Sequence, residues 1–132
     1  MPEAGAYSIT GVVNDKVYVI KSNVTYEYNL TSWSTKKPMP NPRGDCALAT
    51  YQNKIYCIGE RTNSGPSAAN EVYDPASDSW ESKAAMPTPR HDLDANVVNG
   101  KIYVISGLVP DNRWSNVNTR IYNTIIPINL QT

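Results

Sequence analysis

Residues 39–58 read MPNPRGDCALATYQNKIYCI, and residues 86–105 read MPTPRHDLDANVVNGKIYVI. The two stretches align without a gap at an offset of 47 residues, and Trp33 and Trp80 keep that offset upstream. Residues 12–20 match residues 97–105 and form an earlier, partial copy. A repeat period of roughly 20–50 residues indicates a solenoid or a propeller. The chain therefore contains three copies of one unit.

The unit is predicted to consist of four short antiparallel strands in two hairpins. Each copy joins two β-rich runs through a two-residue turn, at 14–15, 52–53 and 99–100. The Asn-Gly turn at 99–100 is the strongest of these hairpin signals, because both turn residues must reach positive φ. A second hairpin is expected around the Asp74-Pro75 turn. The Met-Pro-x-Pro-Arg segments lack backbone donors at their prolines and are expected to be linkers.

These residues resemble the kelch-repeat β-propeller family, chiefly in the Lys-Ile-Tyr-Val-Ile strand, the 72–80 stretch and the 86–90 linker. The resemblance implies an all-β fold of about three four-stranded antiparallel blades, at about 6–37, 45–84 and 92–130, the last incomplete. It also implies that Tyr73 and Trp80 pack between blades. From their repetition we expect Trp33 and Trp80 to be core residues. The third copy lacks this Trp, and its fourth strand is expected to be weak or absent.

Three blades are fewer than a closed propeller contains. A closed propeller takes roughly 4–8 blades, so three would leave an exposed edge and an uncovered apolar face. Two solutions remain open. The chain is a segment of a longer propeller, or two copies form a homodimer that completes a six-bladed ring.

Composition excludes some partners. Lys plus Arg and Asp plus Glu number 12 each, whereas a nucleic-acid binder needs a basic excess. No apolar run approaches the ~20 residues of a membrane span, so neither nucleic acid nor membrane is expected as a partner. The first residues do not resemble a secretory signal, which predicts a cytoplasmic protein, or an extracellular one if the chain comes from a longer precursor.

One face of the predicted units collects the loops between second and third strands together with the linkers. Arg and Trp are enriched at binding hot spots, and loops on rigid scaffolds often carry function. The candidate partner-binding residues on this face are Arg43, Arg61, Arg90, His91, Arg113 and Trp114. Alternatively, Arg43 and Arg90 brace their linkers, and Trp114 packs beneath its own loop. His91 beside Asp92 is interpreted as a satisfied or solvent-facing residue rather than a general base.

The two cysteines are expected to be buried free thiols. Counting outward from the 52–53 turn pairs Cys57 with Leu48 and leaves Cys46 in the diagonal position. Diagonal partners are ~7–8 Å apart at Cα, beyond disulfide geometry. Two cysteines and one histidine also lack the spacing of a metal site, so no metal or other cofactor is expected.

The leading functional prediction is a non-catalytic binding module that engages a protein or peptide partner through the candidate face. An enzyme alternative is a sugar or sugar-acid isomerase using Arg43, Arg90, His91 and Glu60 around a closed channel. A third interpretation is a structural propeller segment inside a larger secreted protein. Each alternative depends on how the missing blades are supplied.

Overall fold

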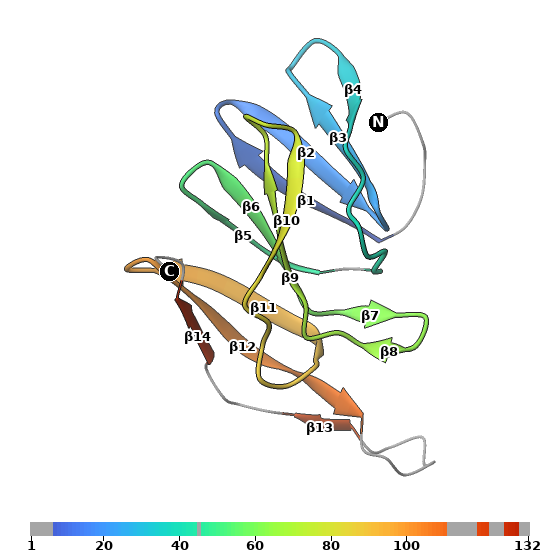
Figure 1. Cartoon of the computed structure of the whole chain (residues 1–132), viewed down its shortest axis with the longest axis vertical. Helices are drawn as coiled ribbons and strands as arrows, with labels where there is room; N and C mark the ends of the chain where they lie inside the picture. The colour runs from blue at the N-terminus through green and yellow to red at the C-terminus, as the bar shows by residue number, and fades with distance from the viewer. Residues whose placement is uncertain (1–6, 45, 111–118, 122–125, 130–132) are drawn as a thin grey trace.

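The computed structural model describes residues 7–44, 46–110, 119–121 and 126–129. All regular structure in these residues is β-strand, arranged as three four-stranded sheets and one two-stranded hairpin (Figure 1). The first sheet contains β1 (Ser8–Val13), β2 (Lys16–Lys21), β3 (Val24–Tyr28) and β4 (Trp33–Lys36). The second contains β5 (Ala47–Tyr51), β6 (Lys54–Ile58), β9 (Asn70–Asp74) and β10 (Ser79–Lys83). The third contains β11 (His91–Val98), β12 (Lys101–Pro110), β13 (Thr119–Ile121) and β14 (Ile126–Asn129), and the hairpin is β7 (Arg61–Thr62) with β8 (Gly65–Pro66).

In the first two sheets each strand pairs antiparallel with the next strand of the same sheet along the chain. In the second sheet the small β7–β8 hairpin lies in sequence between the paired strands β6 and β9. The predicted turns are confirmed, since both central residues of all three have positive φ, from 47° at Gln52 to 72° at Gly100. The predicted pairing of Leu48 with Cys57 is also confirmed. The all-β fold of about three four-stranded antiparallel units is therefore present.

The third sheet departs from this pattern. Strand β12 has 10 residues, whereas β6 has 5. One edge of β12 pairs with β11, and the other edge pairs with β14 near its start and with β13 near its end. The long β12 thus has room for two short strands placed end to end. The weak fourth strand expected from sequence is β14, and it pairs with β12 rather than with β13.

The inner strands of the second sheet, β6 and β9, are buried on both faces because the other two sheets cover them. Period-two alternation divides β6 between two cores. Ile55 and Cys57 join Val13, Tyr18 and other residues in the core shared with the first sheet. The apolar β6 residues of the other face, Tyr56 and Ile58, join the core shared with the third sheet, which also holds Val72, Ala95, Ile102 and Val104.

Tyr73 and Trp80 connect the first two sheets, as the family resemblance implies. The Tyr73 ring lies 5.8 Å from that of Tyr18 across the seam and 5.3 Å from that of Trp80, between centroids. The Trp80 indole donates a 2.9 Å hydrogen bond to the Lys37 carbonyl, just beyond β4. These contacts fasten the second sheet to the edge of the first.

The prediction that both repeated tryptophans are core residues is confirmed only in part, because Trp80 packs against the core shared with the first sheet but neither ring is fully buried. Trp33 and Trp80 are half-buried. Both lie on the fourth strand of their sheets, which is an edge strand, so one side of each ring stays accessible. Trp33 stacks on Tyr28 with ring centroids 4.8 Å apart.

Candidate functional site

Successive antiparallel strands send their connections to opposite ends of the molecule. The turns at 14–15, 52–53 and 75–78 lie at one end, here named the turn face. The other end, here named the loop face, holds the β2–β3 turn, the linkers 37–44 and 84–90, and the segment 59–69. In Figure 1 the β7–β8 hairpin projects from the loop face, away from the turns of the first two sheets.

The structure separates the candidate residues by burial. Arg43, Arg90 and His91 are only 3%, 2% and 4% exposed. Arg61 is exposed at the start of β7, so among the four candidates in the described part of the chain it alone is presented to solvent. Arg113 and Trp114 lie outside the described residues.

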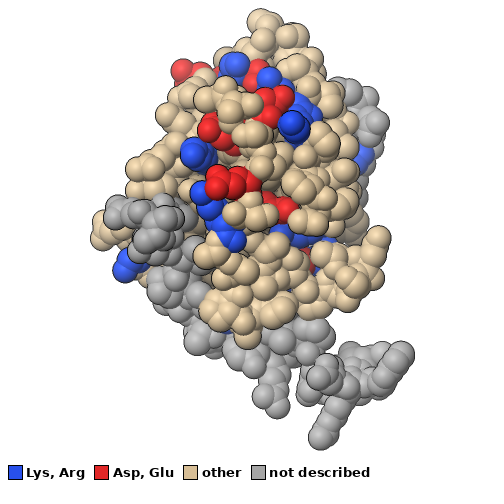
Figure 2. All heavy atoms as spheres, in the orientation of Figure 1, with Lys and Arg blue, Asp and Glu red and all other residues tan. Residues whose placement is uncertain are grey.

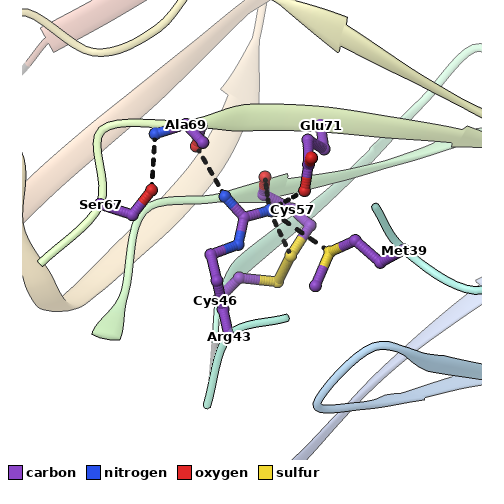
Figure 3. The surroundings of a disulfide bond; sticks show 7 residues. All are labelled: Met39, Arg43, Cys46, Cys57, Ser67, Ala69 and Glu71. Atoms are coloured by element: carbon purple, nitrogen blue, oxygen red, sulfur yellow. Dashed lines mark hydrogen bonds and ion pairs between the residues drawn. A yellow bond between two sulfur atoms is a disulfide. The ribbon is translucent and has the colours of Figure 1, made fainter. Parts of the chain in front are cut away.

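Arg43 is held by a buried network between the linker and the second sheet (Figure 3). Its guanidinium forms a 2.8 Å ion pair with Glu71, and each side chain is 1% exposed. The guanidinium also donates to the carbonyl oxygens of Cys57 and Ala69, at 3.2 and 3.3 Å. The Glu71 carboxylate further accepts a 2.6 Å hydrogen bond from Asn41. Arg43 therefore ties the linker to β6 and β9.

Burial also sets the electrostatics of this network. Desolvation lowers the pKa of Arg43, while the negative charges of Glu71 and Glu60 oppose that shift. The linker backbone adds to the anchoring, because the amides of Met39 and Arg43 donate to carbonyls of the β2–β3 turn at 2.7 and 3.4 Å. The first linker of the loop face is thus fixed to the first two sheets by hydrogen bonds and a buried ion pair.

The prediction of two free thiols is wrong, because Cys46 and Cys57 form a disulfide. Their Cα atoms are 5.3 Å apart, well inside disulfide range. The diagonal distance used in the prediction applies within a ladder, but Cys46 precedes β5 and pairs with nothing in it. Its backbone is therefore free to approach β6. Arg43 lies 3.3 Å from the Cys57 sulfur, so the disulfide and the ion pair adjoin (Figure 3).

Arg90 occupies the place in the second linker that Arg43 occupies in the first. Its side chain bonds Thr88, with two nitrogens 3.2 Å from the hydroxyl. Its carbonyl accepts a 2.8 Å bond from the Glu60 amide, and the Glu60 carboxylate accepts from the Leu93 amide at 3.4 Å. The second linker is thereby joined to both the second and third sheets.

His91 is the first residue of β11. Its Nδ1 atom lies 3.0 Å from the Asp92 carboxylate. Its side chain is 6% exposed, whereas that of Asp92 is 64% exposed. This geometry matches the predicted satisfied histidine.

A hollow of about 280 Å³ opens on the loop face beside Arg61. The β2–β3 turn, the first linker and the β7–β8 hairpin form its walls. The residues that line it are Ser22, Pro42, Arg43, Gly44, Arg61, Thr62 and Asn63. Most of these groups are hydrogen-bonding or cationic, so the hollow suits a polar or acidic segment of a partner.

A second and larger hollow, of about 450 Å³, lies on the turn face between the first two sheets. On its wall the Glu27 carboxylate accepts hydrogen bonds from Tyr18 at 2.9 Å and Lys16 at 3.0 Å, and pairs with Lys36 at 3.6 Å. This cleft was not predicted from the sequence. The available signal was alternation, which places Glu27 on the same sheet face as the core residue Tyr18, opposite which it pairs.

Charges of both signs are mixed on the side of the molecule drawn in Figure 2. Acidic and basic side chains are interspersed across its upper part, without an extended area of one sign. In the described part of the chain no group of three or more His, Cys, Asp or Glu side chains is placed to hold a metal ion. No helix in the same residues is long and apolar enough to cross a membrane.

Residues 42–87 match the family model of the kelch motif. The chain contains a kelch repeat. The matched segment spans the whole second sheet, which is therefore a kelch blade, along with Arg43 and most of the loop-face hollow.

Two further comparisons agree with this assignment. Over 74 residues the chain is 32% identical to an F-box/kelch-repeat protein of Arabidopsis thaliana, covering 53% of this chain and 17% of that protein. Its fold is similar to the solved structure of YjhT, a kelch β-propeller, with a TM-score of 0.72 and 21% identity. That alignment covers 82% of this chain and 36% of YjhT. The chain thus spans well under half the length of either protein, and the three sheets are propeller-type blades.

Proposed function

We propose that this chain is a binding module that engages a protein or peptide partner through its loop face. The single observation that carries the proposal is the 280 Å³ hollow beside the exposed Arg61, built on linkers that buried side chains hold in place. Kelch repeats commonly mediate protein interactions, which supports the assignment. The contact residues would be Arg61, Thr62 and Asn63, with Arg43 acting from beneath as a positioning residue.

The chemistry of the hollow indicates the kind of partner. The Arg61 guanidinium is positively charged and presents several N–H donors, which suit carboxylates and backbone carbonyls. Thr62 and Asn63 add hydrogen-bonding groups at the hairpin. A short, acidic, extended segment of a partner protein fits this set best.

We propose that the role is non-catalytic. All four residues in the isomerase alternative are engaged within the chain. The Arg43 guanidinium pairs with Glu71, and the Glu60 carboxylate accepts from the Leu93 amide. Arg90 and His91 have Thr88 and Asp92 as partners. A substrate would have to displace these buried contacts. This favours a supporting role for them over a chemical one.

The experiment is a selection of linear peptides displayed against the whole chain, followed by fluorescence-anisotropy titration of a selected peptide. Arg61→Ala should weaken binding by at least about tenfold, as removal of a hot-spot arginine does. The matched control is Lys54→Ala, on the turn face directly after the 52–53 turn, which should leave affinity within about twofold. Equal losses in the two variants, or no loss in Arg61→Ala, would contradict the proposal.

We further propose that additional blades cover the two outer faces, and that a second copy of this chain supplies them as a homodimer. Val12, which is 62% exposed, lies on the outer face of the first sheet, since its neighbours Gly11 and Val13 are buried on the other face. Val98 and Ile105, 51% and 38% exposed, lie on that of the third. Light scattering on a size-exclusion column should give the mass of two chains. A well-folded monomer would refute the dimer and favour blades from a longer chain.

The disulfide favours the extracellular alternative over the cytoplasmic expectation. Disulfides persist in oxidising compartments and are rare in the cytosol. Protein isolated from its native source under alkylating conditions should then carry no label on Cys46 or Cys57 until it is reduced. Full labelling without reductant would support the cytoplasmic expectation.

A further inference from the structure

The turn-face cleft is separate from the loop-face hollow and takes no part in the function proposed above. It lies between the first two blades, with Lys16, Glu27 and Lys36 on one wall and Gln52, Asn53 and Asp74 on the other. Its volume of about 450 Å³ falls within the roughly 300–1,000 Å³ typical of small-ligand sites. The cleft is therefore large enough to hold a small molecule or one side chain of a peptide.

One wall carries two lysines fixed by a buried acid. The Glu27 side chain is 9% exposed, while those of Lys16 and Lys36 are 44% and 24% exposed. Burial opposes ionisation of Glu27, but the hydrogen bonds from Lys16 and Tyr18 and the charge of Lys36 outweigh it and lower its pKa. Glu27 is thus a carboxylate at neutral pH, and it positions both ammonium groups at the cleft.

The kelch blade itself does not require this acid. In the second blade Tyr56 replaces Tyr18, and its partner across the strands is Val72, which is 3% exposed. A buried valine fills the place at which the first blade has buried a carboxylate, and desolvating a carboxylate is costly. A local purpose beyond packing explains why Glu27 occupies this position.

On the lysine wall two ammonium groups pair with one carboxylate, that of Glu27, and the charge of Lys36 also acts on the nearby Asp78 carboxylate. Each ammonium carries three donor hydrogens, and Glu27 lies 3.0 Å from the Lys16 nitrogen and 3.6 Å from the Lys36 nitrogen. Both lysines line the cleft, so donors that Glu27 does not engage can reach a group bound there. This wall therefore offers paired cationic donors to an anion.

We propose that the cleft binds a monocarboxylate, whose two oxygens bridge the ammonium groups of Lys16 and Lys36 on the side away from Glu27. The side-chain amides of Gln52 and Asn53 would contact the rest of the ligand. Asp74, on the opposite wall, disfavours a second negative charge and accepts hydrogen bonds from ligand donors. The carboxylate belongs either to a small organic acid or to an acidic side chain of a peptide.

Amide chemical shifts of the ¹⁵N-labelled chain would test this proposal with matched probes. The small-acid arm compares N-acetylglycine with the uncharged N-acetylglycinamide. The peptide arm compares a capped pentapeptide with a central Glu against one with a central Gln. Both carboxylate probes, or the one that represents the true source, should shift signals of cleft residues and bind at least about tenfold more tightly than the neutral analogue.

Variants test the two lysines directly. Lys16→Gln and Lys36→Gln should each weaken carboxylate binding by about fivefold or more, and the dispersed spectrum of each variant reports its folding. Lys54→Gln is the matched control, because Lys54 is the counterpart of Lys16 in the second blade. Binding by the peptide alone or by the small acid alone identifies the source. The proposal is overturned by equal binding of the neutral probes, by absence of shifts at the cleft, or by equal losses in Lys54→Gln and Lys36→Gln.

Discussion

Arg43→Met is the substitution that tests the bracing of the loop face most sharply. Methionine keeps the length of the apolar stem but removes the guanidinium, so the Glu71 carboxylate stays 1% exposed and retains only the Asn41 bond among those described here. Removal of one partner of a buried ion pair costs about 3–5 kcal/mol of unfolding free energy. That is a large share of the roughly 5–15 kcal/mol by which a typical domain is stable.

Urea unfolding followed by tryptophan fluorescence measures this loss. With a slope of about 2 kcal/mol per molar urea, the midpoint should fall by about 1.5–2.5 M. Combining Arg43→Met with Glu71→Leu should recover most of it, because neither charge is then left buried alone. The surface control is Lys83→Met, which breaks an ion pair with Glu81 whose side chains are 36% and 66% exposed. That change should cost less than about 1 kcal/mol.

The reasoning would be refuted by an Arg43→Met variant within about 1 kcal/mol of the parent and no recovery in the double variant. The guanidinium would then contribute little to holding the linker. Arg43 would have to be reconsidered as a residue that contacts the partner.

Three other changes follow from the same structure. Reducing the Cys46–Cys57 disulfide, which spans 11 residues in sequence, should lower the unfolding free energy by about 3 kcal/mol, measured by urea unfolding with and without dithiothreitol. Gly59→Ala should cost at least about 1–3 kcal/mol in the same assay, because Gly59 has a φ of 73° and an added Cβ would lie 3.1 Å from a linker carbonyl. Gly44→Ala, where an added Cβ meets nothing within 4 Å, is the control and should be neutral. Folding lowers the pKa of Glu27, so its contribution to stability is present above the unfolded-state pKa and is lost on acidification. Unfolding free energy should therefore decline between about pH 5 and 3, and less steeply in Glu27→Gln.

The repeat was predictable because it rests on local chemistry. Two-residue turns that require positive φ, and prolines that cannot donate, are properties of a few adjacent residues. Even the weak Gln52-Asn53 turn was assigned correctly, since alignment with Asn99-Gly100 placed it. The strand register followed from the turn, which is why Leu48 pairs with Cys57 as predicted.

The errors arose where one blade meets another or where a strand ends. Cys46 precedes its strand, so a ladder distance did not apply to it. The third sheet includes β14 because β12 is long enough to pair with two strands. This pairing depends on residues that are distant in the sequence. No local pattern reports either outcome.

The candidate site was predictable only in part. Residue type and topology predicted that Arg43, Arg61 and Arg90 lie on one face. They did not predict which guanidinium is buried. Arg43 is buried because Glu71, 28 residues later, supplies its counter-charge. The turn-face cleft was missed for a related reason, since it depends on the side-by-side placement of the first two blades.

Hydrogen exchange of the chain with and without a selected peptide tests the central claim, binding through the loop face, most directly. The account predicts slower exchange at residues 37–44 and 59–66, and unchanged exchange at the turns 14–15 and 52–53. Slower exchange confined to the turn face, with residues 59–66 unaffected, would contradict it.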